Sequence, residues 1–121
     1  MILRGGKAPN CDAEHVEDAS TYLAKAGLRP RIMIDSSHAN SNKDYRNQPL
    51  VIDDVSQQLE SGEERIFGVM IESHLVAGRQ DLVAGESLVY GQSITDGCVD
   101  WETSVQMLER LARAVRKRRE V

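Results

Sequence analysis

Three side chains in this 121-residue sequence have the types and positions expected of metal ligands. His38 and Glu72 each stand at or just beyond the end of an apolar run, and Asp96 lies in the polar segment that follows the last run. One imidazole and two carboxylates suit a divalent ion such as Mn²⁺, Fe²⁺ or Zn²⁺. No short metal motif is present, so the pattern predicts a metal site only if the strands carrying these residues are neighbours in space.

The elements that must position these groups alternate along the chain. Apolar runs predict strands at residues 2–4, 31–35 and 66–72. Helices are predicted from Asn10, acting as the cap, to Gly27, from near Pro49 to Gly62, and over residues 101–119 with Asp100 as the cap. This alternation is typical of βα units, in which functional groups gather at the carboxyl ends of the strands.

Hydrophobic spacing predicts which faces are buried. The three helices present apolar stripes at these positions: His15, Ala19, Tyr22, Leu23 and Ala26; Ile52, Val55 and Leu59; Val105, Leu108, Leu111, Ala112 and Val115. The run 66–72 is apolar on both faces, as in a parallel strand covered on both sides. Residues 73–97 are predicted to form a long functional loop with a short hairpin around residues 89–91.

The composition favours one soluble globular domain over residues 1–121. Apolar residues make up 40% and charged residues 28% of the chain, and the net charge of −4 argues against a nucleic-acid partner. The basic cluster at Arg113 and residues 116–119 is interpreted as a helix end that complements the helix dipole. Without a CxxC pair, a signal peptide or a membrane span, a cytoplasmic protein is expected.

Four strings in the sequence resemble the C-terminal motifs of the type I 3-deoxy-arabino-heptulosonate 7-phosphate (DAHP) synthases, in that family's order. They are ILRGGKAPN at 2–10, MIDSSHAN at 33–40, GVMIESHL at 68–75 and YGQSITD at 90–96. The resemblance covers nearly the whole chain. One string departs slightly, because Ser36 stands where the family often has an aromatic residue.

The resemblance implies a fold and an activity. The family is a (β/α)₈ TIM barrel that condenses phosphoenolpyruvate with erythrose 4-phosphate and releases phosphate, the first step of the shikimate route to aromatic amino acids. By motif match, His38, Glu72 and Asp96 correspond to ligands of a divalent metal ion (Mn, Fe, Zn or Co), and Arg4 to an arginine at the phosphoenolpyruvate site. A guanidinium offers a planar fork to phosphate or carboxylate oxygens, which fits that role.

The resemblance also implies that the chain is partial. The family's fourth metal ligand is a cysteine from the N-terminal half of the barrel, and a complete barrel needs about 250 residues. A chain whose first residues already form a strand is expected to be a piece of a longer protein. Residues 1–121 are therefore expected to be the C-terminal βα units of an incomplete barrel that is inactive alone.

Plainer interpretations stay open for each residue. His38 is a possible polar strand end, Glu72 a solvent-facing charge, and Asp96 a turn or cap residue. Arg4 is a possible partner for a nearby carboxylate, and Cys98 is either close to the metal or a small buried residue.

Two other functions also stay open. One is a non-catalytic α/β fragment that forms a homo-oligomer, because an incomplete barrel leaves strand edges unpaired. The other is an enzyme like octulosonate 8-phosphate synthase, which the four strings fit less well.

Overall fold

The computed structural model describes residues 1–120 and contains a three-stranded parallel sheet. The strands β1 (Ile2–Leu3), β2 (Ile32–Asp35) and β3 (Ile66–Met70) lie in that order in the sheet. The register pairs Leu3 with Ile34 and Ile34 with Val69. A parallel sheet in sequence order brings the carboxyl ends of all three strands to one edge, as the alternating pattern predicts.

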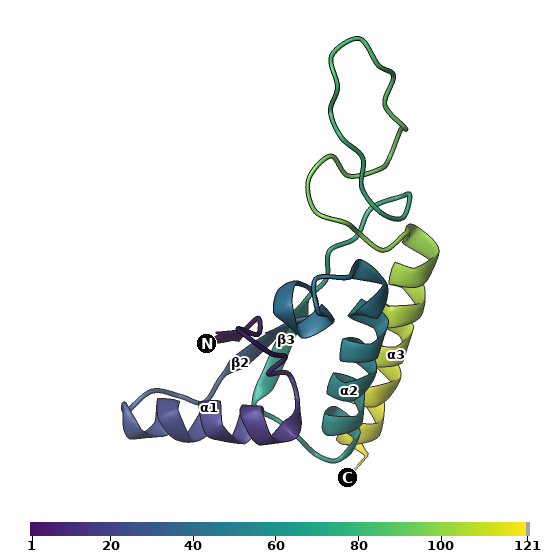
Figure 1. The fold of residues 1–121 in the computed structure, drawn as a ribbon. Coiled ribbons are helices and arrows are strands. Elements are labelled where there is room, and N and C mark those ends of the chain that lie inside the picture. The colour runs from purple at the N-terminus through teal and green to yellow at the C-terminus, as the bar shows by residue number, and fades with distance from the viewer. Residues whose placement is uncertain (121) are drawn as a thin grey trace.

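Three α-helices accompany the sheet (Figure 1): α1 (Ala13–Lys25), α2 (Gln48–Glu60) and α3 (Trp101–Arg119). Helices α2 and α3 lie side by side and run in the same direction (Figure 1). Two 3₁₀ turns, η1 (His38–Ser41) and η2 (Tyr45–Asn47), lead from β2 into α2. No helix within residues 1–120 is both long and apolar enough to cross a membrane.

The core lies between the sheet and the helices. Its fully buried members include Ile32 and Ile34 from β2, Val16 from α1 and Val55 from α2. Burial of such a side chain contributes roughly 1.5–3 kcal/mol relative to leaving it exposed. These contacts fix β2 as the central strand, and the segment after β2 carries His38.

The first helix differs from its prediction at both the cap and the buried face. Asp12, not Asn10, caps α1, accepting from the backbone N–H of His15, because the Asn10 side chain accepts from Gly5 instead. The inward face is Val16, Ala19, Ser20 and Leu23. His15 is exposed, and Tyr22 is 71% exposed.

The positions of β3 and α3 agree with the predicted ranges, but their buried residues differ from the predicted ones. Asp100 caps α3 by accepting from Thr103, as predicted. On α3 the buried residues are Ser104, Met107 and Ala114, and the predicted core residue Leu108 is 53% exposed. The prediction that the strand at residues 66–72 is covered on both faces is wrong, because Phe67 on β3 is 59% exposed.

The segment between β3 and α3 extends well beyond the ends of the helices (Figure 1). It contains no helix or strand, as predicted, and has isolated bridges at Ser73–Val99, Gly78–Cys98 and Arg79–Ser93. The expected hairpin at residues 89–91 is only a turn. The bridges close the base of the loop and return the chain to the sheet edge.

Candidate metal and anion site

The three predicted metal ligands meet at the carboxyl edge of the sheet. One ligand atom from each of His38, Glu72 and Asp96 lies within 4.8 Å of the other two. The Nε2 atom of His38 is 3.9 Å from Oε1 of Glu72. A nitrogen and two carboxylate oxygens at this separation could hold a divalent ion, with positions left for water or substrate.

His38 is oriented by a buried carboxylate. Asp35, the last residue of β2, is 5% exposed, and its Oδ2 atom is 2.8 Å from Nδ1 of His38. A carboxylate accepts hydrogen bonds, so this contact favours the ring tautomer that carries its proton on Nδ1 and leaves Nε2 as an acceptor. The other Asp35 oxygen accepts from the Ser37 backbone N–H at 2.8 Å. The tautomer that a metal ion requires is therefore favoured by the fold.

The backbone around His38 is unusual. His38, Asn42 and Lys43 have φ values of 49°, 54° and 59°, in the left-handed region that non-glycine residues seldom occupy. Such conformations cost of order 1 kcal/mol each and persist where surrounding contacts fix them. Here Lys43 N–H donates to the His38 carbonyl, which closes the turn.

Glu72 is also held on one side and open on the other. The Ser37 hydroxyl donates to Oε2 of Glu72 at 2.8 Å. The remaining oxygen, Oε1, is the one that lies toward His38. The hydrogen bond thus selects which carboxylate oxygen faces the centre of the site.

Asp96 reaches the site because the long loop closes on itself. The Val99 N–H donates to the Glu72 carbonyl, and Gly78 and Cys98 exchange two backbone hydrogen bonds. Gly97 lies against Tyr45, where an added Cβ would be 2.7 Å from Cδ1 of the ring. This close approach requires glycine next to Asp96.

Cys98 takes no part in the group of ligand atoms. Among residues 1–120 that group contains His38, Glu72 and Asp96, and the Cys98 thiol donates instead to the Asp96 carbonyl. Burial raises the pKa of the Cys98 thiol, so the thiol stays protonated. Cys98 is half-buried, so neither the interpretation as a residue close to the metal nor that as a small buried residue describes it fully.

Arg4 lines the same cavity, which has a volume of about 720 Å³ and also contains the three candidate ligands. Within residues 1–120 no carboxylate forms a salt bridge with Arg4, so the plain interpretation as an ion-pair partner is not supported. Buried Asn40 ties the end of β1 to the end of β2 through bonds to the carbonyls of Leu3 and Asp35. Arg4 is thereby fixed beside the loop that carries His38.

Sequence reasoning missed several residues of this cavity. Lys43, Arg46 and Arg79 add basic groups to its lining. Arg46 pairs with Asp44, and its hydrogen bond lowers the pKa of that carboxyl, while Arg79 pairs with Asp81. The ligand-orienting residues Asp35 and Ser37 were also missed, although their place directly before His38 was a usable signal.

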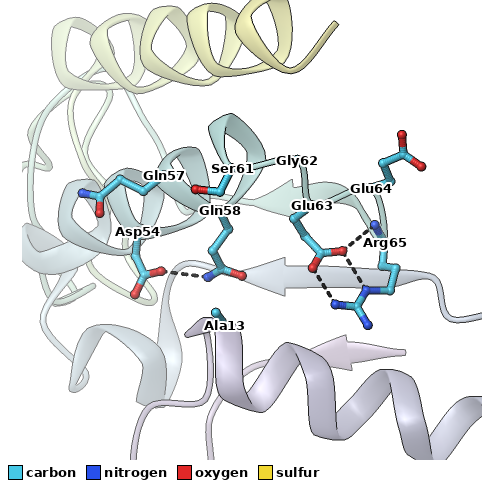
Figure 2. A pocket seen from close by; sticks show the side chains of 9 residues that line it. All are labelled: Ala13, Asp54, Gln57, Gln58, Ser61, Gly62, Glu63, Glu64 and Arg65. Atoms are coloured by element: carbon cyan, nitrogen blue, oxygen red, sulfur yellow. Dashed lines mark hydrogen bonds and ion pairs between the residues drawn. The ribbon is translucent and has the colours of Figure 1, made fainter. Parts of the chain in front are cut away.

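A second pocket lies beside the amino end of β3, between the end of α2 and the start of α1 (Figure 2). Its charged side chains bond to their neighbours: Glu63 accepts two hydrogen bonds from the Arg65 guanidinium, and Asp54 accepts from Gln58. The Arg65 hydrogen bonds lower the pKa of Glu63. None of the predicted site residues lies in this pocket.

The curated proteins that this chain resembles in sequence include several phospho-2-dehydro-3-deoxyheptonate aldolases. It is 54% identical over 119 residues to the Phe-sensitive phospho-2-dehydro-3-deoxyheptonate aldolase of Escherichia coli strain K12, covering 98% of this chain and 34% of that protein. It is 53% identical to the tyrosine-inhibited aldolase of Schizosaccharomyces pombe, covering 99% of this chain and 34% of that one. The chain thus spans about a third of the length of these curated relatives.

A solved structure and a family model agree with this result. The phospho-2-dehydro-3-deoxyheptonate aldolase of Francisella tularensis SCHU S4 superposes with a TM-score of 0.92 at 52% identity, over 97% of this chain and 34% of that one. The model of the DAHP synthetase I family matches residues 1–109. With the motif order and the site geometry, these matches show that the chain belongs to the DAHP synthetase I family.

Proposed function

We propose that this chain supplies most of the metal site and part of the substrate site of a DAHP synthase, which condenses phosphoenolpyruvate with erythrose 4-phosphate in the cytoplasm. The observation that carries the proposal is the convergence of His38, Glu72 and Asp96 in one cavity with Arg4. The strands β1 to β3 would then be consecutive strands of a (β/α)₈ barrel, whose active sites lie at the carboxyl ends of its strands.

The donor set fits a divalent ion. His38 presents Nε2 because Nδ1 is bonded to Asp35, and Glu72 presents Oε1 because Oε2 is bonded to Ser37. A divalent ion such as Mn²⁺, Fe²⁺, Zn²⁺ or Co²⁺ held there would supply Lewis acidity toward the aldehyde carbonyl of the sugar phosphate.

The basic lining is the part of the site that recognises the substrates. Arg4 offers paired N–H donors to the phosphate or carboxylate of phosphoenolpyruvate, a charge-assisted geometry that neutral donors do not match. Lys43, on the other side of His38 in the sequence, forms no salt bridge within residues 1–120 and adds a positive charge to the same cavity. The positive charges of Arg4 and Lys43 are expected to attract the phosphate groups of both substrates into this cavity.

Activity is expected only in a complete barrel, because three strands do not close one. The family resemblance also places a fourth metal ligand, a cysteine, in a segment outside the four motifs of this chain. We therefore expect no loss of phosphoenolpyruvate when the isolated 121-residue chain is mixed with both substrates and Mn²⁺.

A chimera tests the proposal. This chain would replace the matching third of the E. coli relative, to which it is 54% identical. The chimera is expected to consume phosphoenolpyruvate only when erythrose 4-phosphate is present. His38→Ala in the chimera is expected to abolish turnover and bound metal, whereas His15→Ala, on the exposed side of α1, should change neither.

A folded chimera that lacks activity, or one that keeps its metal after His38→Ala, would contradict the proposal. Replacing erythrose 4-phosphate with the sugar phosphate of octulosonate 8-phosphate synthase distinguishes that related activity. Turnover with that sugar alone would favour it.

Self-association of the isolated chain is a second candidate, favoured by the exposed side chains of Ile2 and Phe67 on the two outer strands. Their 62% and 59% exposure leaves apolar surface at both edges of the sheet. A homo-oligomer is therefore expected, and a purely monomeric species in light scattering would argue against it.

A further inference from the structure

Gln48 is a polar side chain at a fully buried position. It is the first residue of α2 and has 0% of its surface exposed. Burying an amide that lacks hydrogen bonds is unfavourable, so a glutamine at this position requires specific partners. Those partners lie at the candidate metal site.

The Gln48 amide clamps the main chain of Glu72. Its Oε1 atom accepts from the Glu72 backbone N–H at 2.9 Å, and its Nε2 atom donates to the Glu72 carbonyl at 2.9 Å. This is the pair of bonds that a neighbouring strand would provide. Because β3 ends at Met70, the side chain of Gln48 continues the hydrogen bonding where the sheet stops.

The same amide contacts the segment that leads to His38, and the Glu72 carbonyl links it to the loop that carries Asp96. The Ser36 hydroxyl lies 2.9 Å from Oε1 and 2.8 Å from the Met70 carbonyl and shares its single proton between these two acceptors. Ser36 stands two residues before His38. The Glu72 carbonyl bonded by Gln48 also accepts from Val99, which closes the loop carrying Asp96. Gln48 is thus bonded directly to the Glu72 segment and in contact with Ser36, and it is linked to the Asp96 loop through the Glu72 carbonyl.

We infer that Gln48 is a positioning residue that holds the Glu72 carboxylate at its separation from His38, and that it does so without touching the ion. This inference rests on the proposed metal function. Shifting Glu72 alters both its hydrogen bond from Ser37 and the 3.9 Å distance from its Oε1 to His38 Nε2. Outer hydrogen bonds of this kind typically change metal affinity 10- to 100-fold.

The alternative role for Gln48 is general stabilisation of the fold, and α2 offers a matched control. Gln58 lies on the same helix and is 8% exposed, and its Nε2 atom donates to the Cys11 carbonyl and to Asp54, away from the site. Substituting either glutamine removes buried hydrogen bonds. Only substitution of Gln48 is expected to affect metal binding.

The experiment uses the chimera described above, in which the rest of the barrel is present. It compares the Mn²⁺ dissociation constant of the chimera that carries the wild-type chain with those of its Gln48→Met, Gln58→Met and His38→Ala variants, by titration with detection of free Mn²⁺. Urea unfolding of each variant is measured in parallel. Gln48→Met is expected to weaken Mn²⁺ binding by about tenfold or more, with Gln58→Met within about twofold of wild type. Both methionine variants are expected to unfold at lower urea concentration.

Equal Mn²⁺ affinity in Gln48→Met and Gln58→Met, with wild type binding more tightly than His38→Ala, would overturn this inference and leave the metal site standing. Wild-type affinity no higher than that of His38→Ala would overturn both. If Gln48→Met does not fold, Gln48→Asn replaces it, because the shorter amide cannot reach Glu72 and Ser36 together. Unchanged affinity in Gln48→Asn would then overturn the inference.

Discussion

The two pockets described above both contain carboxylates and a guanidinium, but their hydrogen bonds run in different directions. At the amino end of β3, Glu63 and Arg65 bond to each other (Figure 2). At the carboxyl ends of the strands, His38 and Glu72 bond outward to Asp35 and Ser37. Outward bonds leave one atom of each candidate ligand free toward a common centre, while mutual pairing leaves few such atoms.

The difference shows that charge alone does not identify a site. A paired carboxylate and guanidinium satisfy each other and contribute modestly to stability. A side chain whose outer polar atom is hydrogen-bonded cannot rotate away, and its other polar atom stays available. A metal site requires this property of its ligands. The comparison therefore predicts that changes near the carboxyl edge alter binding, and that changes at the other pocket alter stability only.

Among changes to the groups that hold the candidate ligands from behind, the largest expected effect comes from Asp35→Asn. In Asp35→Asn the amide NH₂ would take the place of Oδ2 and present a donor to Nδ1 of His38. The ring would then carry its proton on Nε2, the atom that we propose binds the metal. We expect Mn²⁺ binding to weaken roughly 10- to 100-fold in a titration. Asp54→Asn at the other pocket is the control, and equal effects of the two changes would break the comparison.

A smaller effect is expected from Gly5→Ala, which tests the close contact between the main chain after Arg4 and Ala39. Gly5 has φ of +80°, and an added Cβ would be 2.6 Å from Cβ of Ala39. We expect a loss of about 1–3 kcal/mol in the free energy of unfolding by urea. At Gly6 an added Cβ meets nothing within 4 Å, so Gly6→Ala should change stability by less than about 0.5 kcal/mol. Similar unfolding midpoints for both variants would disprove the close contact.

The smallest effect concerns the pH dependence of stability at the second pocket. Hydrogen bonds from Arg65 lower the pKa of Glu63 below its ordinary value of 4.5. Stability from this pair is therefore complete above that value and is lost as pH falls through the lowered pKa. The difference in unfolding free energy between wild type and Glu63→Gln should shrink in acid. A difference independent of pH would show that the pair does not act through ionisation.

Most strands and helices of this chain could be predicted from its sequence. The apolar runs around Ile34 and Val69 gave the strands, and Asp100 gave the cap of α3 because a short side-chain acceptor satisfies free N–H groups. Errors arose where a long-range partner competed. Asn10 has a capping side chain, but Gly5 takes its oxygen, so Asp12 caps α1.

The sequence by itself determined which residue types end the strands, and the parallel order then followed from the alternation of strands and helices. Only the tertiary structure decided that Asp96 returns to Glu72, because backbone bonds at Gly78 and Val99 close a loop that has no periodic pattern. It also decided that Gln48 bonds to Glu72. Such contacts join residues far apart in the chain, and hydrophobic spacing carries no information about them.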